Sequence, residues 1–356
     1  MFERVPELLH RQLPEFVPPF PGSIVKLVGP KSPFLRHGEM SLFLAWRDGQ
    51  PVGRIAAMLN RTHNRYYQDK VGFFGFFDFS DELEVSGALL SAATQKLKEW
   101  GATSARGPYN PSINDECGLL IQGFERPPYI LMPFNPPYYL NHFEHLDLKL
   151  AKRLYAFSIS ADVTPPERIE KIVQRVKSRS GITLRNVNLS RLDDELRVLH
   201  KLYNDTLTVN WGFVPIDLED LQASAADLKA FVEPEMVMIA EKDGQPVGFS
   251  LALPNLNQFL WETKKMPELL RMAWVGLKLW LSHPTEARLA VLGVEPAFRN
   301  KGLGVLFYYE SLVRGKRRYK GGELSWVDED NQEMVRAIET MGGQLYRTYG
   351  IFEKAI

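Results

Sequence analysis

The sequence predicts a mixed α/β protein built from two domains of the same type, and two observations carry this prediction. The chain has 356 residues, of which 45% are hydrophobic, so it can bury more than one core of ordinary size. The hexamer DGQPVG occurs twice, at residues 48–53 and 243–248, each time after an apolar run. Asp-Gly between two apolar runs indicates a tight hairpin, because glycine tolerates positive φ.

The elements that follow each hexamer also repeat in the same order. Each half continues with a strand-like run, a second apolar strand and then a helix. In the first half these segments are residues 54–59, 71–79 and 86–101, and in the second half 249–253, 287–296 and 302–322. A chance match of a common turn is the alternative, but a repeated order of elements favours a duplicated domain.

The connector SADVTPPER, residues 160–168, is the candidate domain boundary because of its paired prolines. We therefore expect an N-terminal domain at 1–160 and a C-terminal domain at 161–356. The second copy is longer between its turn and its helix, and the extra residues form an apolar helical insertion at 255–284.

Charge and composition limit the classes of partner. Lys plus Arg equals Asp plus Glu at 43 each, so no net field favours nucleic acid. The one cysteine, Cys117, cannot form an internal disulfide, which suits a reducing compartment. The N-terminus lacks the pattern of a signal peptide, and no window of 18 uncharged apolar residues predicts a transmembrane span. The expected location is cytoplasmic.

The strand-to-helix junction of the second copy, VEPAFRNKGLGV, carries the chemistry. An apolar strand ends at Val294, Pro296 and Arg299 follow, and Gly302 and Gly304 open a helix. A helix N-terminus presents unpaired N–H groups and the positive end of a dipole, both of which favour anions. Glycines let a phosphate approach the backbone. The junction therefore predicts a pyrophosphate cradle, and a plain βα turn is the alternative.

The spacing R-x-x-G-x-G after a V-x-P strand end resembles the acyl-CoA signature of the GNAT superfamily of N-acyltransferases. The resemblance implies tandem GNAT-like domains, each with a mixed, mostly antiparallel sheet flanked by helices. It also implies that acetyl-CoA or a longer acyl-CoA is the co-substrate and that no metal is needed. Carried over residue by residue, it assigns cofactor binding to Leu292, Val294, Arg299, Asn300, Lys301, Gly302, Leu303, Gly304 and Asn331.

The first copy lacks this cradle. Gly87 stands in the place of Gly304, but Glu82 falls where Arg299 stands, and Asp81 and Glu84 add further negative charge. Acidic side chains would repel a pyrophosphate. Other stretches are similar to those of a bacterial group of tandem GNAT-like proteins, so the resemblance covers nearly the whole chain. We expect only the second domain to bind acyl-CoA.

Many GNAT enzymes use a tyrosine as general acid, and the matching position here holds Ile338. Tyr346 or Tyr349 could replace it, although aromatic strand residues more often belong to a core. Asp328 and Glu329 follow the strand ELSWV, where the resemblance places the thioester. Glu329 is the candidate general base, with helix capping near Asp330 as the alternative role for this acidic run.

The acceptor side and the insertion supply the remaining candidates. Asn210 and Trp211 lie in the region that covers the acceptor in this fold, with packing as the alternative role for Trp211. In the insertion, Trp274 and Leu277 belong to a helix that is apolar on nearly every side. Three interpretations stay open for that helix: packing between the domains, the wall of an acyl-chain or lipid channel, and a surface that dips into a membrane.

The resemblance thus implies an acyl-CoA-dependent N-acyltransferase that transfers an acetyl or longer acyl group to a primary amine. The acceptor is a small molecule or a lipid-like amine, as in bacterial ceramide-forming N-acyltransferases. A non-catalytic acyl-CoA-binding or sensing protein is the alternative, because the usual tyrosine is missing. Peripheral contact with a membrane is compatible with the first interpretation.

Overall fold

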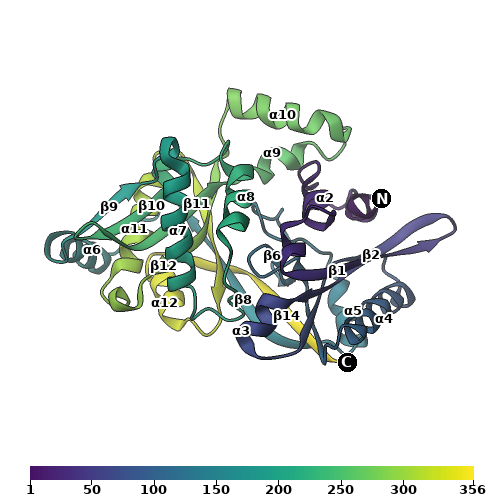
Figure 1. Cartoon of the computed structure of the whole chain (residues 1–356). Coiled ribbons are helices and arrows are strands. Elements are labelled where there is room, and N and C mark those ends of the chain that lie inside the picture. Colours follow the sequence, from purple (N-terminus) through teal and green to yellow (C-terminus); the bar gives the residue numbers. More distant parts are fainter. The chain divides into compact units, whose positions relative to one another are not determined.

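The computed structural model describes residues 1–356, apart from the side chain of Asp227. The chain divides into two compact units (Figure 1). Unit 1 comprises residues 1–154, 256–282 and 347–356, and unit 2 comprises residues 155–255 and 283–346. Within the described part of the chain, every helix is too short or too polar to cross a bilayer.

Unit 1 consists of a mixed sheet with helices on its faces and two short strands beside it. Its elements are η1 (Phe2–Arg4), α1 (Val5–His10), α2 (Ser23–Val28), η2 (Pro33–Arg36), β1 (Gly38–Arg47), β2 (Gln50–Asn60), α3 (Arg61–Tyr67), β3 (Val71–Phe79), α4 (Leu83–Glu99), β4 (Ser104–Gly107), β5 (Tyr109–Asn110), β6 (Glu116–Cys117), β7 (Leu119–Gln122), α5 (Tyr139–His145), α9 (Asn257–Glu262) and α10 (Glu268–Leu281).

Unit 2 repeats the same order of hairpin, third strand, helix and parallel strand. Its elements are α6 (Glu167–Arg179), β9 (Ile182–Asn186), η3 (Leu189–Arg191), α7 (Leu192–Thr206), α8 (Leu218–Leu228), η4 (Pro234–Met236), β10 (Val237–Lys242), β11 (Gln245–Pro254), β12 (Glu286–Val294), η5 (Pro296–Phe298), α11 (Leu303–Gly315), β13 (Gly321–Asp328) and α12 (Gln332–Thr340).

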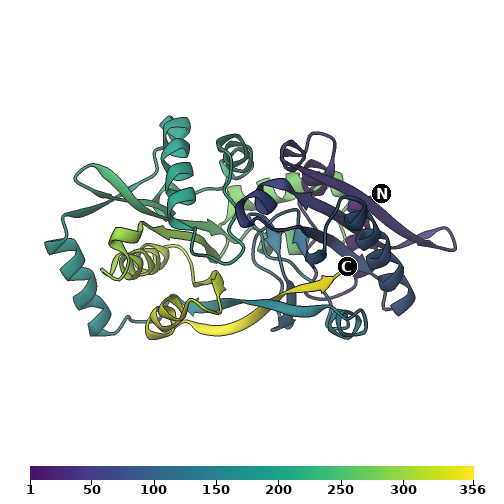
Figure 2. The same cartoon turned by 60° about the horizontal axis from the view of Figure 1, so that its bottom comes forward.

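Two long strands continue from one unit into the other (Figures 1 and 2), β8 (Lys149–Ser160) and β14 (Gln344–Ala355). In unit 1 the end of β14 pairs antiparallel with β4, from Phe352↔Gly107 to Ala355↔Ser104. In unit 2 β8 neighbours β13. Each sheet is therefore completed by a strand from the other half of the sequence. Because the compact units are not the sequence repeats, the boundary at 160/161 stays a prediction.

The two DGQPVG hexamers form the same turn. Asp48 and Gly49 have φ of 49° and 75°, and Asp243 and Gly244 have φ of 51° and 75°. Positive φ at both central residues is typical of a type I′ hairpin, which matches the twist of the flanking strands. In both hairpins the strand register shifts after the second residue pair from the turn, between Ala45 and Trp46 in the first and between Ala240 and Glu241 in the second. The predicted hairpins are present with equal geometry.

The mixed sheet predicted from the sequence is also confirmed in each unit. In unit 1, β3 is antiparallel to β2 and parallel to β4. In unit 2, β12 is antiparallel to β11 and parallel to β13. The connecting helices α4 and α11 return the chain for the parallel step, as such crossovers require.

A glycine in the second strand of each hairpin brings that helix close to its sheet. A Cβ at Gly53 would lie 2.6 Å from Leu89 of α4, and one at Gly248 would lie 3.1 Å from Phe307 of α11. The core of each unit is built around this contact, since Leu89 and Phe307 are among its buried residues. The repeat therefore extends from the turn to the packing of the central helix.

Candidate active site

The site begins where β12 and β13 part. Their parallel pairing runs from Glu286↔Gly321 to Leu289↔Leu324 and ends there. Within the described sheet, residues 290–294 of β12 therefore have β11 on one side and no strand on the other. A register shift on the β11 side, between Leu251 and Ala252, marks a bulge at the same level. Leu292 and Val294 thus lie on an edge that can pair with an extended ligand.

The N-terminus of α11 follows directly after this edge. Gly302 is the N-cap residue, with φ of 84°, and no side chain among the described residues caps the helix. The first intrahelical bond is donated by Leu306 to Gly302, so the amides of Leu303, Gly304 and Val305 precede it. These N–H groups and the helix dipole make a ready anion site.

The two glycines of the junction serve different purposes. A Cβ at Gly302 would lie 2.9 Å from Ile172 and 3.0 Å from Val176 of α6. Gly302 is therefore required by its positive φ and by the packing of α6. No atom lies within 4 Å of the place where a Cβ on Gly304 would be, and its φ is ordinary. The space beside Gly304, together with the amides at the start of the helix, can accept a pyrophosphate group.

Helix α6 also holds α11 through charge. The Lys177 ammonium lies 2.6 Å from Glu310, and Arg314 lies 3.2 Å from the same carboxylate. Burial alone would raise the pKa of Glu310, but the two cations outweigh burial, and its pKa lies below the ordinary value. The Lys177 ion pair therefore joins α6 to the middle of α11, whereas the Arg314–Glu310 pair lies within α11 itself.

Arg299, predicted to bind the cofactor, braces the loop. Its Nε donates to the carbonyl of Val294 at 3.2 Å, and Nη2 donates to the carbonyl of Thr206 at 2.8 Å. The guanidinium thereby joins the end of β12 to the end of α7. Two of its three nitrogens are used in this way, so its contribution to an anion nearby is chiefly its charge.

The neighbouring polar residues tie the junction to α12. The Asn300 amide donates to both carboxylate oxygens of Glu333, at 2.8 and 2.6 Å. The Asn331 side chain caps α12 by accepting from the amide of Met334 at 3.2 Å. Lys301 is exposed, with its ammonium 5.3 Å from the centre of the Phe298 ring. The cofactor candidates on residues 299–304 and Asn331 therefore belong to one connected region of unit 2.

The acceptor-side and acidic candidates also meet. Asp328, at the end of β13, accepts from the backbone N–H of Trp211 at 3.1 Å and from that of Asp330 at 3.2 Å. Asn210 takes part in the turn that carries Trp211, since its carbonyl accepts from Phe213. The Asp328 carboxylate thus anchors the turn that was predicted to cover the acceptor. Glu329 follows it, half-buried.

A second brace on this turn comes from α7. The Asn204 side chain donates to the Ile216 carbonyl and accepts from the Ile216 amide, both at 3.0 Å. His200 contacts the same carbonyl at 2.8 Å. Paired side-chain bonds of this kind fix a loop in one conformation. The segment between α7 and α8 is therefore held at both ends.

The candidates for a general acid are placed differently. Ile338 has a hydrocarbon side chain and is fully buried in the core of unit 2. This position therefore cannot supply a proton. Tyr349 is buried in unit 1, where it pairs with Leu120 across β14 and β7. The Tyr346 hydroxyl donates to the carboxylate of Glu323 in unit 2. The assignment of Tyr349 to catalysis stays a prediction.

One buried polar cluster was not predicted from the sequence. Arg288 and Glu323 oppose each other across β12 and β13, with 3.6 Å between Nε and Oε1. Ser325 donates to Glu323 at 2.5 Å and accepts from Arg288 at 2.9 Å. Because Ser325 comes directly after the last paired residue, the cluster lies at the fork. The available signal was a charged residue inside each apolar strand, EARLAVLGV and GGELSWV.

In unit 1 the matching edge is filled by the chain itself. The Oδ1 atom of Asn110 accepts from the backbone N–H of Phe76 on β3 at 2.6 Å. A side chain at Gly75 would collide with the carbonyl of Tyr109. Strand β5 therefore covers the stretch of β3 that corresponds to the open edge of β12.

The N-terminus of α4 in unit 1 is closed as well. Glu82, its N-cap residue, and Glu84 form ion pairs with Arg47. Ser86, at the fourth position of the helix, contacts Nδ1 of His142 from α5 at 2.8 Å. Negative charge and the packing of α5 leave this helix end unsuited to a phosphate. The expectation that only the second copy has a cradle stays a prediction.

The insertion belongs to unit 1. Trp274 donates from Nε1 to Glu262 at 3.2 Å, and Lys278 lies 5.2 Å from the centre of the Trp274 ring. Leu277 is 45% exposed. Helix α10 is thus not fully buried, and some of its apolar side chains are exposed. The assignment of Trp274 and Leu277 to substrate binding stays a prediction.

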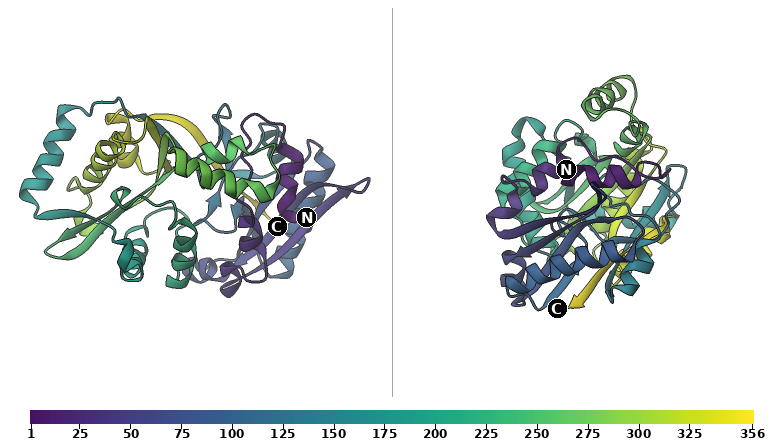
Figure 3. Two further views of the ribbon diagram at one scale, coloured as in Figure 1. Left: turned by 90° about the horizontal axis from the view of Figure 1, so that it is seen from above. Right: turned by 90° about the vertical axis from the view of Figure 1, so that its right-hand side faces the viewer.

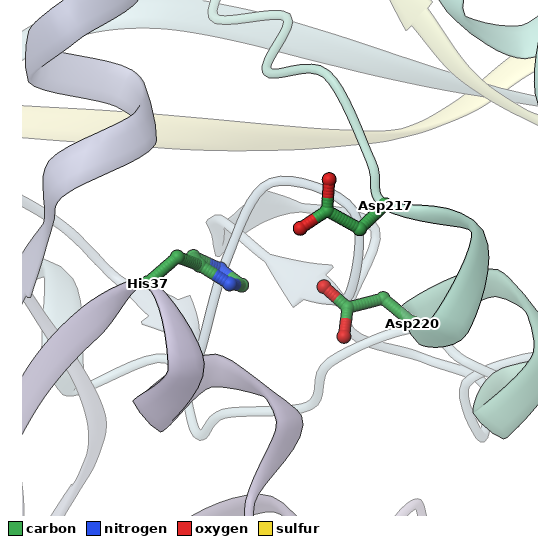
Figure 4. Close-up of side chains that lie close together, drawn as sticks. All are labelled: His37, Asp217 and Asp220. Carbon is green, nitrogen blue, oxygen red and sulfur yellow. The ribbon is translucent and has the colours of Figure 1, made fainter.

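Two carboxylates stand together at the start of α8 in unit 2. Asp217 is the N-cap residue and Asp220 follows in the first turn (Figure 4). The spacing of three residues puts them on one side of the helix, where they favour its dipole. His37, also labelled in Figure 4, belongs to unit 1. The helix dipole accounts for the two aspartates, and we assign them no ligand.

Fold and site together define an acyltransferase of tandem GNAT architecture. The model of the acetyltransferase (GNAT) family matches residues 196–342, which include β12, α11 and α12. Over its whole length the chain is 32% identical to the bacterial ceramide synthase of Caulobacter vibrioides, covering 94% of that protein. It is 31% identical to protein YghO of Escherichia coli, covering 92% of it. The chain belongs to the GNAT family.

A solved structure supports the tandem arrangement. A tandem GNAT protein from the clavulanic acid biosynthesis pathway aligns over 99% of this chain and 95% of its own, with a TM-score of 0.58. Its sequence identity to this chain is 12%. At that identity the likeness concerns the fold alone, and it agrees with the duplication predicted from the two hexamers.

Proposed function

We propose that the chain is an acyl-CoA-dependent N-acyltransferase whose acyl-CoA site is the N-terminus of α11 and the open edge of β12. The observation that carries this proposal is the uncapped start of α11 with space before Gly304. The amides of residues 303–305 would hold the pyrophosphate, and the edge at residues 290–294 would pair with the extended arm of CoA. Bound acyl-CoA supplies the activated acyl group as a thioester.

The chain's own residues act on the acceptor. The amine nitrogen must lose a proton as its bond to the acyl carbon forms, and the departing sulfur must gain one as its bond to that carbon breaks. Glu329, beside the end of β13, is our candidate to take the proton from the amine. Asp328 holds the turn of Trp211 in place through a backbone hydrogen bond, which supports its role in positioning the acceptor.

A lipid-like primary amine is the proposed acceptor. The support is the relative named bacterial ceramide synthase, whose similarity extends over 100% of this chain. The role of the apolar insertion in binding an acyl or acceptor chain stays a prediction, because the insertion belongs to unit 1 and the proposed acyl-CoA site to unit 2.

The test is release of CoA thiol from acyl-CoAs of two, eight and sixteen carbons with a long-chain primary amine or a short one of equal basicity. The proposal expects thiol release with the long-chain amine and formation of the matching amide, identified by mass. Turnover with the short amine alone would support the transferase activity and contradict the proposal of a lipid-like acceptor.

A non-catalytic acyl-CoA-binding protein is the second candidate, favoured by one observation. Ile338 replaces the usual tyrosine and is fully buried, so this position offers no acid. In that case calorimetry would detect acyl-CoA binding while no amine of either kind released thiol. The same two measurements therefore distinguish the two candidates.

A further inference from the structure

Helix α10 turns an uncharged apolar face to the outside. Arg271, Val275 and Leu279 recur at four-residue spacing and face unit 1. The opposite side carries Leu269, Leu270, Ala273, Gly276, Leu277, Trp280 and Leu281, all exposed. Leu269 is 93% exposed and Trp280 is 81% exposed. A helix on a protein surface normally has charged residues on its exposed side. The exposed side of α10 carries apolar residues instead.

The helix is firmly attached to unit 1. Arg271, 3% exposed, forms an ion pair with Glu7 of α1. The Trp261 indole donates to the carbonyl of Pro14 at 2.7 Å, and the Lys264 ammonium donates to those of Leu13 and Pro14. Figures 1 and 3 show α10 as the outermost element on this side of unit 1, beyond α9. The exposed face is therefore a built surface of the folded chain.

The charges around this face bear on which kind of membrane surface it could contact. Lys278 is neutralised by Glu262 at 2.8 Å, and Arg271 by Glu7. Lys264 and the exposed Lys265 stand just before the helix and take part in no ion pair within the described residues. Glu268 is the first residue of α10. Burial holds the pKa of Lys264 below its ordinary value and outweighs Glu15, which lies close enough to raise that pKa. Cations thus border one end of a face that is otherwise apolar.

We propose that α10 docks in the interface of an anionic phospholipid bilayer, lying in its plane. The helix has 14 residues and is about 21 Å long, which is too short to span a bilayer but typical of an interfacial helix. Leucines would enter the acyl boundary, and Trp280 is amphipathic in the way that suits the headgroup level. Lys265 would contact lipid phosphates, and Lys264, whose ammonium is hydrogen-bonded to Leu13 and Pro14, would contribute its charge.

This surface goes beyond the proposed function and does not depend on it. If the acceptor is a lipid-like amine, docking would bring the chain to the phase in which that amine is dissolved. If the transferase proposal fails, the exposed face still needs a cover, since contiguous apolar patches of this kind mark interaction sites. Vesicle binding and thiol release can therefore succeed or fail independently.

The experiment is flotation of the full chain with two kinds of vesicle. One contains phosphatidylcholine alone, and the other contains phosphatidylcholine with about 30% phosphatidylglycerol, which gives its surface a strong negative charge. We expect binding to the mixed vesicles and quenching of tryptophan fluorescence by brominated lipid. The double variant Leu269→Ser, Trp280→Ser should bind at least about tenfold more weakly, since affinity scales with buried apolar area.

The matched control is Leu42→Ser, Trp46→Ser on β1 of the same unit, where these side chains are 40% and 53% exposed. This variant should float like the wild-type chain, and thermal melts should show both variants folded. Equal loss in both variants, or no flotation of the wild-type chain, would overturn the proposal. Light scattering tests whether a second copy of the chain covers the face instead. A dimer that is lost in the α10 variant, in a chain that does not bind vesicles, would assign the face to a second copy.

Discussion

The side chain of Asn110 occupies the edge of β3 in unit 1, where its Oδ1 atom accepts from the N–H of Phe76 at 2.6 Å. In unit 2 the corresponding edge of β12 continues beyond its last pair with β13, at Leu289 and Leu324. The duplicated fold thus has one edge covered from within the chain and one edge that no strand of the described sheet pairs with. The proposal of a single acyl-CoA site rests on this difference.

Replacing Gly302 by alanine should destabilise unit 2. The residue has φ of 84°, and its Cβ would lie 2.9 Å from Ile172, so we expect a loss of about 1–3 kcal/mol in the free energy of unfolding. Gly304→Ala is the matched control, because space surrounds its Cβ position and its φ is ordinary. Urea titration of the two variants checks this, and an equal effect of both changes would contradict the distinction between the glycines.

Glu329→Gln should lower turnover while leaving acyl-CoA affinity nearly unchanged. Loss of a general base costs typically 10²–10⁴-fold in rate, and steady-state kinetics beside calorimetry with acyl-CoA measure both quantities. Asp328→Asn is the comparison, because this carboxylate accepts from the amides of Trp211 and Asp330. We expect it chiefly to raise KM for the amine. A decrease in turnover below about threefold for Glu329→Gln would assign Glu329 to structure.

Removing one member of the buried Arg288–Glu323 pair should be costly. The Glu323 side chain is inaccessible to solvent and that of Arg288 is 3% exposed, and breaking such a pair costs about 3–5 kcal/mol because one charge stays buried alone. Arg288→Met with Glu323→Leu should cost less than either single change. Chemical unfolding of the three variants measures the coupling, and simple additivity would show that the two side chains do not depend on each other.

Stability between pH 4 and pH 2 should depend on Asp78 in unit 1. Burial alone would raise its pKa, but Arg54 at 2.7 Å and His10 lower it to about 2. A depressed pKa stabilises the fold above the unfolded value near 4 and loses this contribution as pH falls toward 2. The contribution is on the order of 2 kcal/mol.

Asp78→Asn provides the readout for that pH dependence. At pH 6 the variant should be less stable than the wild-type chain, and the difference between the two should shrink as the pH falls from about 4 to about 2. Unfolding by urea at several pH values measures it. A difference that stays constant over this range would exclude Asp78 as the titrating group.

Local chemistry made much of the fold predictable. Asp48–Gly49 and Asp243–Gly244 define their turns through positive φ, which short sequence patterns encode directly. The junction at residues 299–304 is equally local, and its glycines indicated the helix start. The exchange of β8 and β14 between the units was not predictable, because strand pairing over such distances depends on register and topology that no local pattern specifies.

Parts of the site were hidden for a related reason. Arg288 and Glu323 are separated in the sequence and meet only because β12 and β13 are parallel neighbours. The role of Asn110 in covering β3 depends on a similar long-range contact. For α10, leucines and tryptophans give the same apolar pattern whether a helix is buried or exposed, so only the structure could show that Leu269 and Trp280 face outward.

The most direct test of the single acyl-CoA site is calorimetry of acyl-CoA with the wild-type chain, Gly304→Val and Gly87→Val. The sequence comparison pairs these two glycines, but Gly304 is the second residue of α11 and Gly87 the fifth residue of α4. A Cβ at Gly87 would have only an ordinary contact, 3.8 Å from Leu146. The account predicts one site per chain, loss of binding in Gly304→Val and unchanged affinity in Gly87→Val, with both variants folded. Two sites per chain, or undiminished binding by Gly304→Val, would contradict it.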